Sequence, residues 1–127
     1  MNNEPIIKRT GLRRIAYTFV HSYNGVKWLV KNEAAFQQEL MIFVPLVVIA
    51  CLLPFSLLQV VFIVLSMMFV LFAEMVNSAI EAVVDRIGLE FHPLSKVAKN
   101  IGSACVTLSI IMSLMVWGTL LWLLVAH

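Results

Sequence analysis

Charged residues are scarce in this chain: they make up 13% of its 127 residues, whereas 61% are hydrophobic. Soluble domains contain about 25% charged residues, so this composition excludes an ordinary soluble domain. The shortage is concentrated, because residues 40–73 and 100–126 contain no Asp, Glu, Lys, Arg or His. Each stretch is longer than the ~20 apolar helical residues that cross the hydrocarbon core of a bilayer. We therefore expect an all-α integral membrane protein.

Glycine, cysteine and net charge are also low, and each shortage excludes a class of site. The five glycines form neither a G-x-x-x-x-G-K-[ST] loop nor a G-x-G-x-x-G loop, which excludes a P-loop protein and a protein-kinase fold. Cys51 and Cys105 lie in apolar runs, which predicts small buried side chains rather than disulfides or a zinc site. A net charge of +2, without a basic patch interleaved with aromatics, indicates no nucleic-acid partner.

The apolar pattern predicts a surface helix followed by three membrane spans, in a single domain of residues 1–127. Over residues 10–30, apolar side chains recur every three or four positions, and basic residues occupy the opposite face. This is typical of an amphipathic helix that lies on an anionic membrane surface. Pro54 interrupts the first long apolar stretch and divides it into two spans. The predicted transmembrane helices are residues 34–53, 56–84 and 100–125.

The distribution of basic residues predicts the orientation in the membrane. Six of the nine Lys and Arg residues precede the first span, and the other three are Arg86, Lys96 and Lys99. Because basic loops stay in the cytoplasm, we expect the N-terminus and the 85–99 loop on that side. Three short spans cannot enclose a roomy pocket, so we expect any active site to lie between subunits.

A polar stripe marks the cytoplasmic end of the second span. It contains Glu74, Asn77, Ser78, Glu81 and Asp85, which are three or four positions apart and so share one helix face. A carboxylate at the bilayer centre costs about 2.5 kcal/mol or more, which makes such residues functional candidates. The alternative for the last two acids is simple solvation at a helix end.

A second acidic position suggests a magnesium site. Glu33 is expected at a depth similar to that of Glu81, on a neighbouring helix, and Mg²⁺ commonly takes one or two carboxylates together with substrate phosphates. The alternative for Glu33 is a helix-cap residue or a surface acid paired with Lys31. Nearby cations in the 85–99 loop would suit a polyphosphate. His92, before a proline, fits either this site or a hydrogen-bonding turn.

Three segments of the chain resemble the small prokaryotic diacylglycerol kinase family: NEAAF at 32–36, EMVNSAIEAVVDRIG at 74–88 and HPLSKVAK at 92–99. With the surface helix and the three spans, the resemblance covers essentially the whole chain. It implies a homotrimer in the bacterial inner membrane. It also implies transfer of the γ-phosphoryl group of MgATP to diacylglycerol, which gives phosphatidic acid for lipid recycling and phospholipid metabolism.

The resemblance also implies roles for individual residues. Glu74 matches the general base and Asn77 its polar neighbour, while Glu33 and Glu81 match the carboxylates that hold Mg²⁺. The positions that match the ATP-binding set are Arg14, His21, Glu33, Glu81, Glu90, Phe91, His92, Lys99 and Asn100. The positions that match the lipid-substrate set are Ala35, Phe36, Gln37, Gln38, Glu39, Glu74 and Ser103.

Some positions depart from the family pattern and leave alternatives open. Asn100 stands where an aspartate is usual, and His21 stands where a tyrosine commonly lies near the adenine. Pro93 and Lys96 resemble the undecaprenol kinase branch, whereas residues 32–36 resemble the Gram-negative diacylglycerol enzymes. The alternatives are therefore an undecaprenol kinase with the same chemistry, or a non-catalytic membrane assembly protein whose polar stripe only binds helices.

Overall fold

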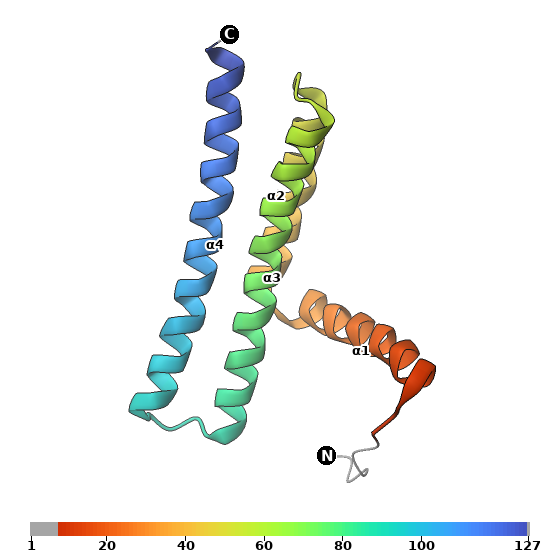
Figure 1. Cartoon of the computed structure of the whole chain (residues 1–127). Helices are drawn as coiled ribbons and strands as arrows, with labels where there is room; N and C mark the ends of the chain where they lie inside the picture. Colours follow the sequence, from red (N-terminus) through yellow and green to blue (C-terminus); the bar gives the residue numbers. More distant parts are fainter. Residues whose placement is uncertain (1–7, 127) are drawn as a thin grey trace.

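The fold, taken from a computed structural model that describes residues 8–126, consists of four helices. α3 and α4 run antiparallel side by side, α2 packs on α3, and α1 points away from them near mid-height (Figure 1). α2, α3 and α4 are each long and apolar enough to cross a membrane, which confirms the predicted all-helical class with three spans. The helices are α1 (Gly11–Asn32), α2 (Ala34–Leu52), α3 (Leu57–Ile87) and α4 (Pro93–Val125).

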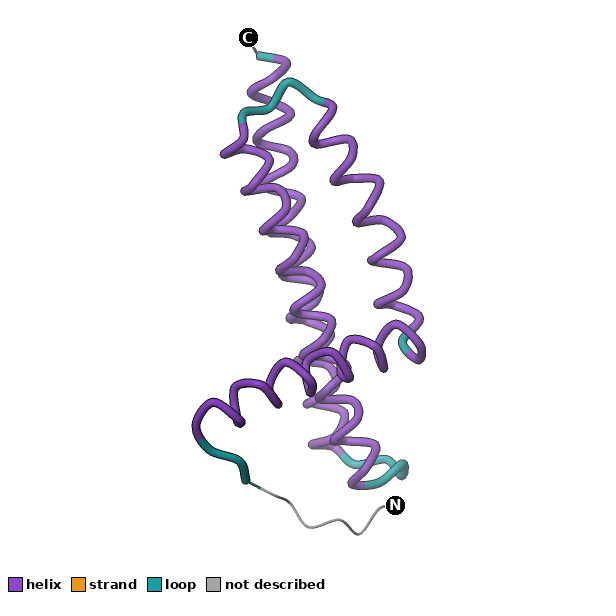
Figure 2. Tube along the Cα trace, turned by 90° about the vertical axis from the view of Figure 1, so that its right-hand side faces the viewer, coloured by secondary structure: helices purple, strands orange, loops and turns teal. Residues whose placement is uncertain are grey.

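A single residue turns the chain from α1 into α2. Glu33 has an extended backbone, with φ −104° and ψ 107°, so it ends one helix and precedes the next. Its amide donates to the Leu29 carbonyl at 2.9 Å, and the Gln37 side chain donates to the Val30 carbonyl at 2.7 Å. These bonds hold the junction, so that α1 lies obliquely across the long axes of the other helices (Figure 2).

The turn between α2 and α3 follows the predicted break at Pro54. Ser56 caps α3 in a reciprocal arrangement with Gln59: the Gln59 amide donates to the Ser56 hydroxyl at 3.2 Å, and the Ser56 amide donates to the Gln59 side chain at 2.9 Å. This capping box satisfies two of the free amide groups at the helix start. The local sequence therefore defines where the second span begins.

α4 begins at Pro93, earlier than the predicted start of the third span at 100, and α3 continues to Ile87. The predicted 85–99 loop is therefore mostly helical, which corrects that boundary. His92 caps α4, since its Nδ1 accepts from the Leu94 amide at 3.1 Å, and proline suits the first helical position. The apolar run predicts the span, but the capped helix begins before that run, at Pro93.

Small side chains let α3 and α4 approach closely. Ser109 is fully buried in α4, and the Ser113 hydroxyl lies 3.0 Å from that of Ser66 in α3. Small residues at helix contacts and hydroxyl pairs between helices are how membrane helices associate. Most large apolar side chains point outward instead. Cys51 and Cys105 are also exposed free thiols, so their predicted burial is wrong, because the apolar residues of a membrane helix can face lipid.

Candidate functional site

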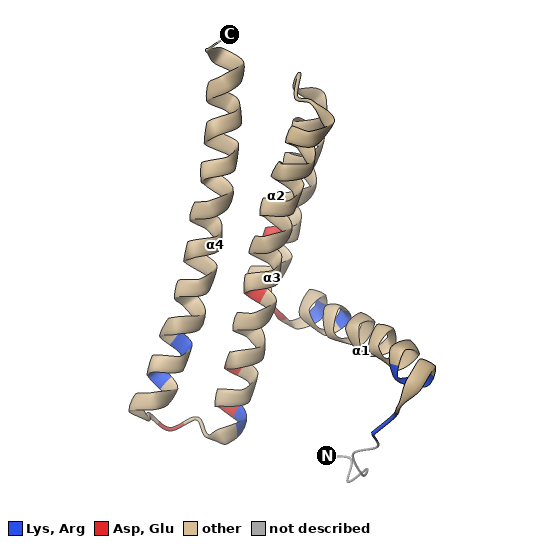
Figure 3. Ribbon diagram, viewed as in Figure 1, with Lys and Arg blue, Asp and Glu red and all other residues tan. Residues whose placement is uncertain are grey.

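Charged side chains gather in the half of the molecule that contains α1 and the α3–α4 turn (Figure 3). Acidic residues lie along α3 and near the junction of α1 and α2, and basic residues lie on α1 and at the adjoining ends of α3 and α4. The other half of the three long helices is free of charge in the described residues. The candidate site therefore lies where membrane helices meet polar surroundings.

The predicted polar stripe of α3 is largely buried in the folded subunit. Glu74 is 6% exposed and Ser78 is 4% exposed, and Asn77 is also buried. Glu74 lies beside the Glu39 carboxyl group of α2. One Glu39 oxygen is buried without a hydrogen-bond partner. Two predicted site residues from different helices thus meet inside the subunit.

Asn77 links the stripe to α4. Its amide nitrogen donates to a Glu81 carboxylate oxygen at 3.3 Å, and its amide oxygen is buried without a hydrogen-bond partner. That oxygen faces Gly102, where an added Cβ would collide with it. Gly102 therefore allows the close approach of α4 to the site. Sequence reasoning missed this residue, although a glycine at the start of an apolar helix is a signal of close packing.

Of the two acids predicted to hold a metal, Glu33 lies at the junction of α1 and α2, and Glu81 lies two turns after Glu74 on α3. Within residues 8–126 no three His, Cys, Asp or Glu side chains form a metal-binding group. This arrangement fits Mg²⁺ as a partner of phosphates, because that ion commonly uses only one or two protein carboxylates. In the described chain the alternative ion pair of Glu33 with Lys31 is not formed.

Five predicted ATP-binding residues line one cavity of about 290 Å³ at the α3–α4 turn: Glu90, Phe91, His92, Lys99 and Asn100. The Lys99 ammonium pairs with Asp85 at 2.8 Å, an exposed ion pair that joins the ends of the two helices. The sequence leaves two alternatives for Asp85, a member of the stripe or a solvated residue at a helix end. In the structure it is the partner of Lys99.

Two further predicted ATP-binding residues lie elsewhere. Arg14 and His21 line a different hollow, of about 520 Å³, on α1. The Arg9 guanidinium lies over the Tyr17 ring there, at 3.6 Å from its centre, and the Tyr17 and His21 rings are 6.1 Å apart. Within this chain, the hollow on α1 and the cavity at the α3–α4 turn share no lining residue.

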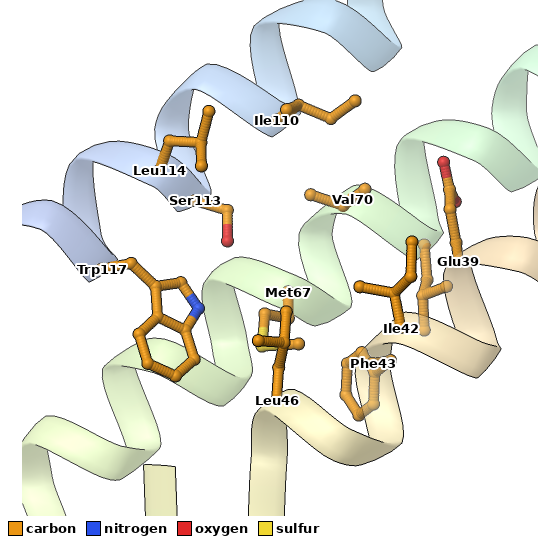
Figure 4. A pocket seen from close by; sticks show the side chains of 11 residues that line it. Glu39, Ile42, Phe43, Leu46, Met67, Val70, Ile110, Ser113, Leu114 and Trp117 are labelled. Carbon is orange, nitrogen blue, oxygen red and sulfur yellow. The ribbon is translucent and has the colours of Figure 1, made fainter. Parts of the chain in front are cut away.

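The predicted lipid residues are also divided between surfaces. Glu39 lies at one end of an apolar cavity of about 260 Å³ between α2, α3 and α4, and Trp117 lies at the other end (Figure 4). Phe36 is buried, whereas Ser103 is exposed on α4. Ala35 and Gln38 are exposed and Gln37 is half-buried at the junction of α1 and α2. The fold thus brings Glu39 and Glu74 together.

Comparison with known proteins assigns the family. The sequence profile described as "Prokaryotic diacylglycerol kinase" matches residues 20–121. Diacylglycerol kinase of Escherichia coli (strain K12) is 46% identical over 113 residues, covering 89% of this chain and 93% of that protein. The Pseudomonas aeruginosa diacylglycerol kinase is 38% identical over 121 residues, covering 95% and 98%, and the Haemophilus influenzae enzyme is 36% identical over 115 residues, covering 91% and 98%. These matches confirm the resemblance noted in the sequence, and the chain belongs to the prokaryotic diacylglycerol kinase family.

Proposed function

We propose that the protein phosphorylates diacylglycerol to phosphatidic acid, with ATP as the phosphoryl donor. Membership of the family supports this activity, as do the relatives named diacylglycerol kinase. The single observation within the fold that carries it is Glu74, a buried acid in a membrane helix at the boundary between its apolar and polar parts. An acid placed there can reach a lipid hydroxyl while phosphates remain in water.

In the proposed reaction the lipid hydroxyl oxygen forms a bond to the γ-phosphorus of ATP. The bond between that phosphorus and the oxygen bridging to the β-phosphate breaks, and ADP leaves with the electron pair. Glu74 takes the hydroxyl proton as general base. Phosphoryl transfer depends mainly on positioning and charge neutralisation, so the protein needs few other reacting groups.

The remaining residues of the site position substrate groups. Glu33 and Glu81 would hold Mg²⁺, which when bound neutralises phosphate charge. Asn77 holds the Glu81 carboxylate through its 3.3 Å hydrogen bond. Lys99, at the cavity beside the α3–α4 turn, would bind phosphate oxygens in place of Asp85. These roles place the nucleotide outside the bilayer and the lipid within it.

The same proposal includes a topology and an oligomer. Positive charge on α1 and at the α3–α4 turn favours a bacterial inner-membrane protein with both segments in the cytoplasm, and with α1 lying on the membrane surface. A homotrimer with sites between subunits is supported by the two separate sets of ATP-binding residues, which one subunit does not join. In the cell, such an enzyme would return diacylglycerol to phospholipid synthesis.

The proposal is tested by labelled-phosphate transfer from MgATP in mixed micelles that offer diacylglycerol or undecaprenol, with Glu74→Gln as the control. We expect labelled phosphatidic acid from the natural protein and none from the variant, with unchanged assembly. Labelled undecaprenyl phosphate alone would instead assign the sister activity. A folded sample that labels neither lipid, and a variant that alters assembly, would identify a non-catalytic membrane protein.

A further inference from the structure

Glu33 is the single residue between α1 and α2, and its backbone is extended. It occupies the capping position before α2, yet its side chain makes no capping bond. No ion pair among residues 8–126 includes its carboxylate either. The position of this carboxylate therefore depends on the backbone of the junction, and on whatever fixes the angle between the two helices.

Gln37 bonds to both sides of this junction. Its side-chain amide donates to the Val30 carbonyl of α1 at 2.7 Å, and its backbone amide donates to the Glu33 carbonyl at 3.1 Å. The last carbonyls of a helix have no partner within that helix, so the side-chain bond satisfies one of them. The side-chain amide of Asn32, by contrast, donates to Trp28 within α1 and does not cross the junction.

Buried apolar side chains lie on both sides of the same junction. Leu29 of α1 is 6% exposed, and Phe36 of α2 is 3% exposed. A rotation about the φ or ψ bond of Glu33 would change the angle between α1 and α2, and so it would move Val30 away from Gln37. Because α2 packs on α3, the same rotation would move the Glu33 carboxylate relative to the polar stripe. The bond from Gln37 opposes that movement.

We propose that Gln37 is a positioning residue, whose side-chain bond to Val30 keeps the Glu33 carboxylate where it would hold Mg²⁺. This inference rests on the proposed function, and it gives Glu33 the support that Asn77 gives to Glu81. It differs from the lipid contact that the family resemblance implies for Gln37. The side-chain amide of Gln37 turns back to α1 and is already bonded there.

The test compares Gln37→Met, which removes the donor at similar length, with Gln37→Arg, which keeps an N–H donor. For Gln37→Met we expect the Mg²⁺ concentration at half-maximal phosphate transfer to rise about threefold to tenfold, the loss of one neutral hydrogen bond. The Kd for MnADP, read without turnover by electron paramagnetic resonance, should rise by the same factor. Hydrogen exchange of residues 29–37 should become faster. Gln37→Arg should restore the natural value of all three.

Gln59→Met is the matched control. It removes a side-chain bond of 2.9 Å at the α2–α3 turn, in the half of the molecule without charges (Figure 3). That change should leave the Mg²⁺ requirement and the Kd for MnADP unchanged. Equal effects of the two methionine variants on metal binding would overturn the inference, because Gln37 would then act only through general stability.

Other outcomes also decide the matter. A higher KM for diacylglycerol with unchanged metal binding would make Gln37 a lipid contact and overturn the inference. Should Gln37→Met fail to fold, Gln37→Glu replaces it, since its added charge alone would strengthen metal binding. Weaker binding of MnADP by that variant would support the positioning role, and stronger binding would refute it. A natural protein that transfers phosphate to no lipid would refute the proposed function, whereas hydrogen exchange and MnADP binding would still test Gln37.

Discussion

Buried polar atoms without hydrogen-bond partners gather around Glu74. Three of the four in the described chain belong to Glu39, Asn77 and Ser78, and all three residues lie around Glu74. Folded proteins pair almost all buried polar groups, so such exceptions require an explanation. Under the proposed function, a bound substrate would supply hydrogen-bonding groups to this cluster. The fourth atom, the Trp117 indole nitrogen, faces the apolar cavity instead.

Removing the Asn77 side chain tests whether its hydrogen bond positions the Glu81 carboxylate. We expect Asn77→Ala to lower kcat/KM for MgATP by about tenfold or more, because a hydrogen bond to a charged group contributes about 1.5–3 kcal/mol. The measurement is steady-state kinetics over a range of Mg²⁺ concentrations, where the variant should need more of the ion. An unchanged Mg²⁺ dependence would contradict the role given to this pair.

Variants of the Asp85–Lys99 ion pair test whether these residues contribute to stability or to nucleotide binding. Its side chains are about half exposed, at 49% and 44%, so Asp85→Asn should change the free energy of unfolding by about 1 kcal/mol or less. Lys99→Met should likewise change the free energy of unfolding by about 1 kcal/mol or less. It should, however, sharply raise the KM for ATP. Denaturation and kinetics on both variants check this. A large loss of stability in either would show that the pair is mainly structural.

At the scale of the elements, the contact between α3 and α4 depends on small residues. Gly102 faces the Asn77 amide, and the hydroxyls of Ser66 and Ser113 meet further along. This contact sets how close α4 comes to the polar stripe. Residues of one helix therefore position catalytic candidates that lie on another.

Gly102→Ala should separate these two helices. The added methyl group would meet the Asn77 oxygen, so we expect a loss of about 1–3 kcal/mol in the free energy of unfolding, together with reduced activity. Gly118→Ala, in the same helix, is the matched control, because nothing lies within 4 Å of its added carbon. That change should be neutral or stabilising, since alanine favours helix over glycine. Equal effects at the two positions would refute the close approach.

At the scale of the whole molecule, the subunit leaves much of its apolar surface uncovered and its ATP-binding candidates divided. Lipid can cover the apolar surface, but only a second copy of the chain can bring α1 to another subunit's α3–α4 turn. This division supports the proposal of sites shared between subunits, and a cyclic homotrimer would repeat such an interface identically.

Mixing two variants, each with impaired ATP binding, tests the shared site. If Arg14 of one subunit serves the Lys99 site of its neighbour, then Arg14→Met and Lys99→Met subunits, reassembled together, should recover about one quarter of the natural rate, because random neighbours restore that share of interfaces. The measurement is phosphate transfer after co-reconstitution at equal amounts. Activity no greater than that of either variant alone would place both residues in the site of one subunit.

Features that depend on local pattern were predictable from the sequence. The three apolar helices follow from the length of the apolar runs, and the break at Pro54 follows from local turn chemistry. The spacing of Glu74, Asn77 and Ser78 placed them on one helix face. The start of α4 at Pro93 did not follow from the apolar pattern, because the capping residue His92 lies before the apolar run that predicts the span.

The sequence by itself determined the class of the protein, its spans and its polar stripe, because hydropathy and helical period are properties of consecutive residues. The tertiary structure decided which neighbours the stripe residues meet: Glu74 lies beside Glu39, Asn77 faces Gly102, and Ser78 lines a groove between α1 and α3. It also decided the pairing of Asp85 with Lys99. These contacts depend on how helices distant in the chain pack together, and the spacing of residues along one helix does not encode that packing.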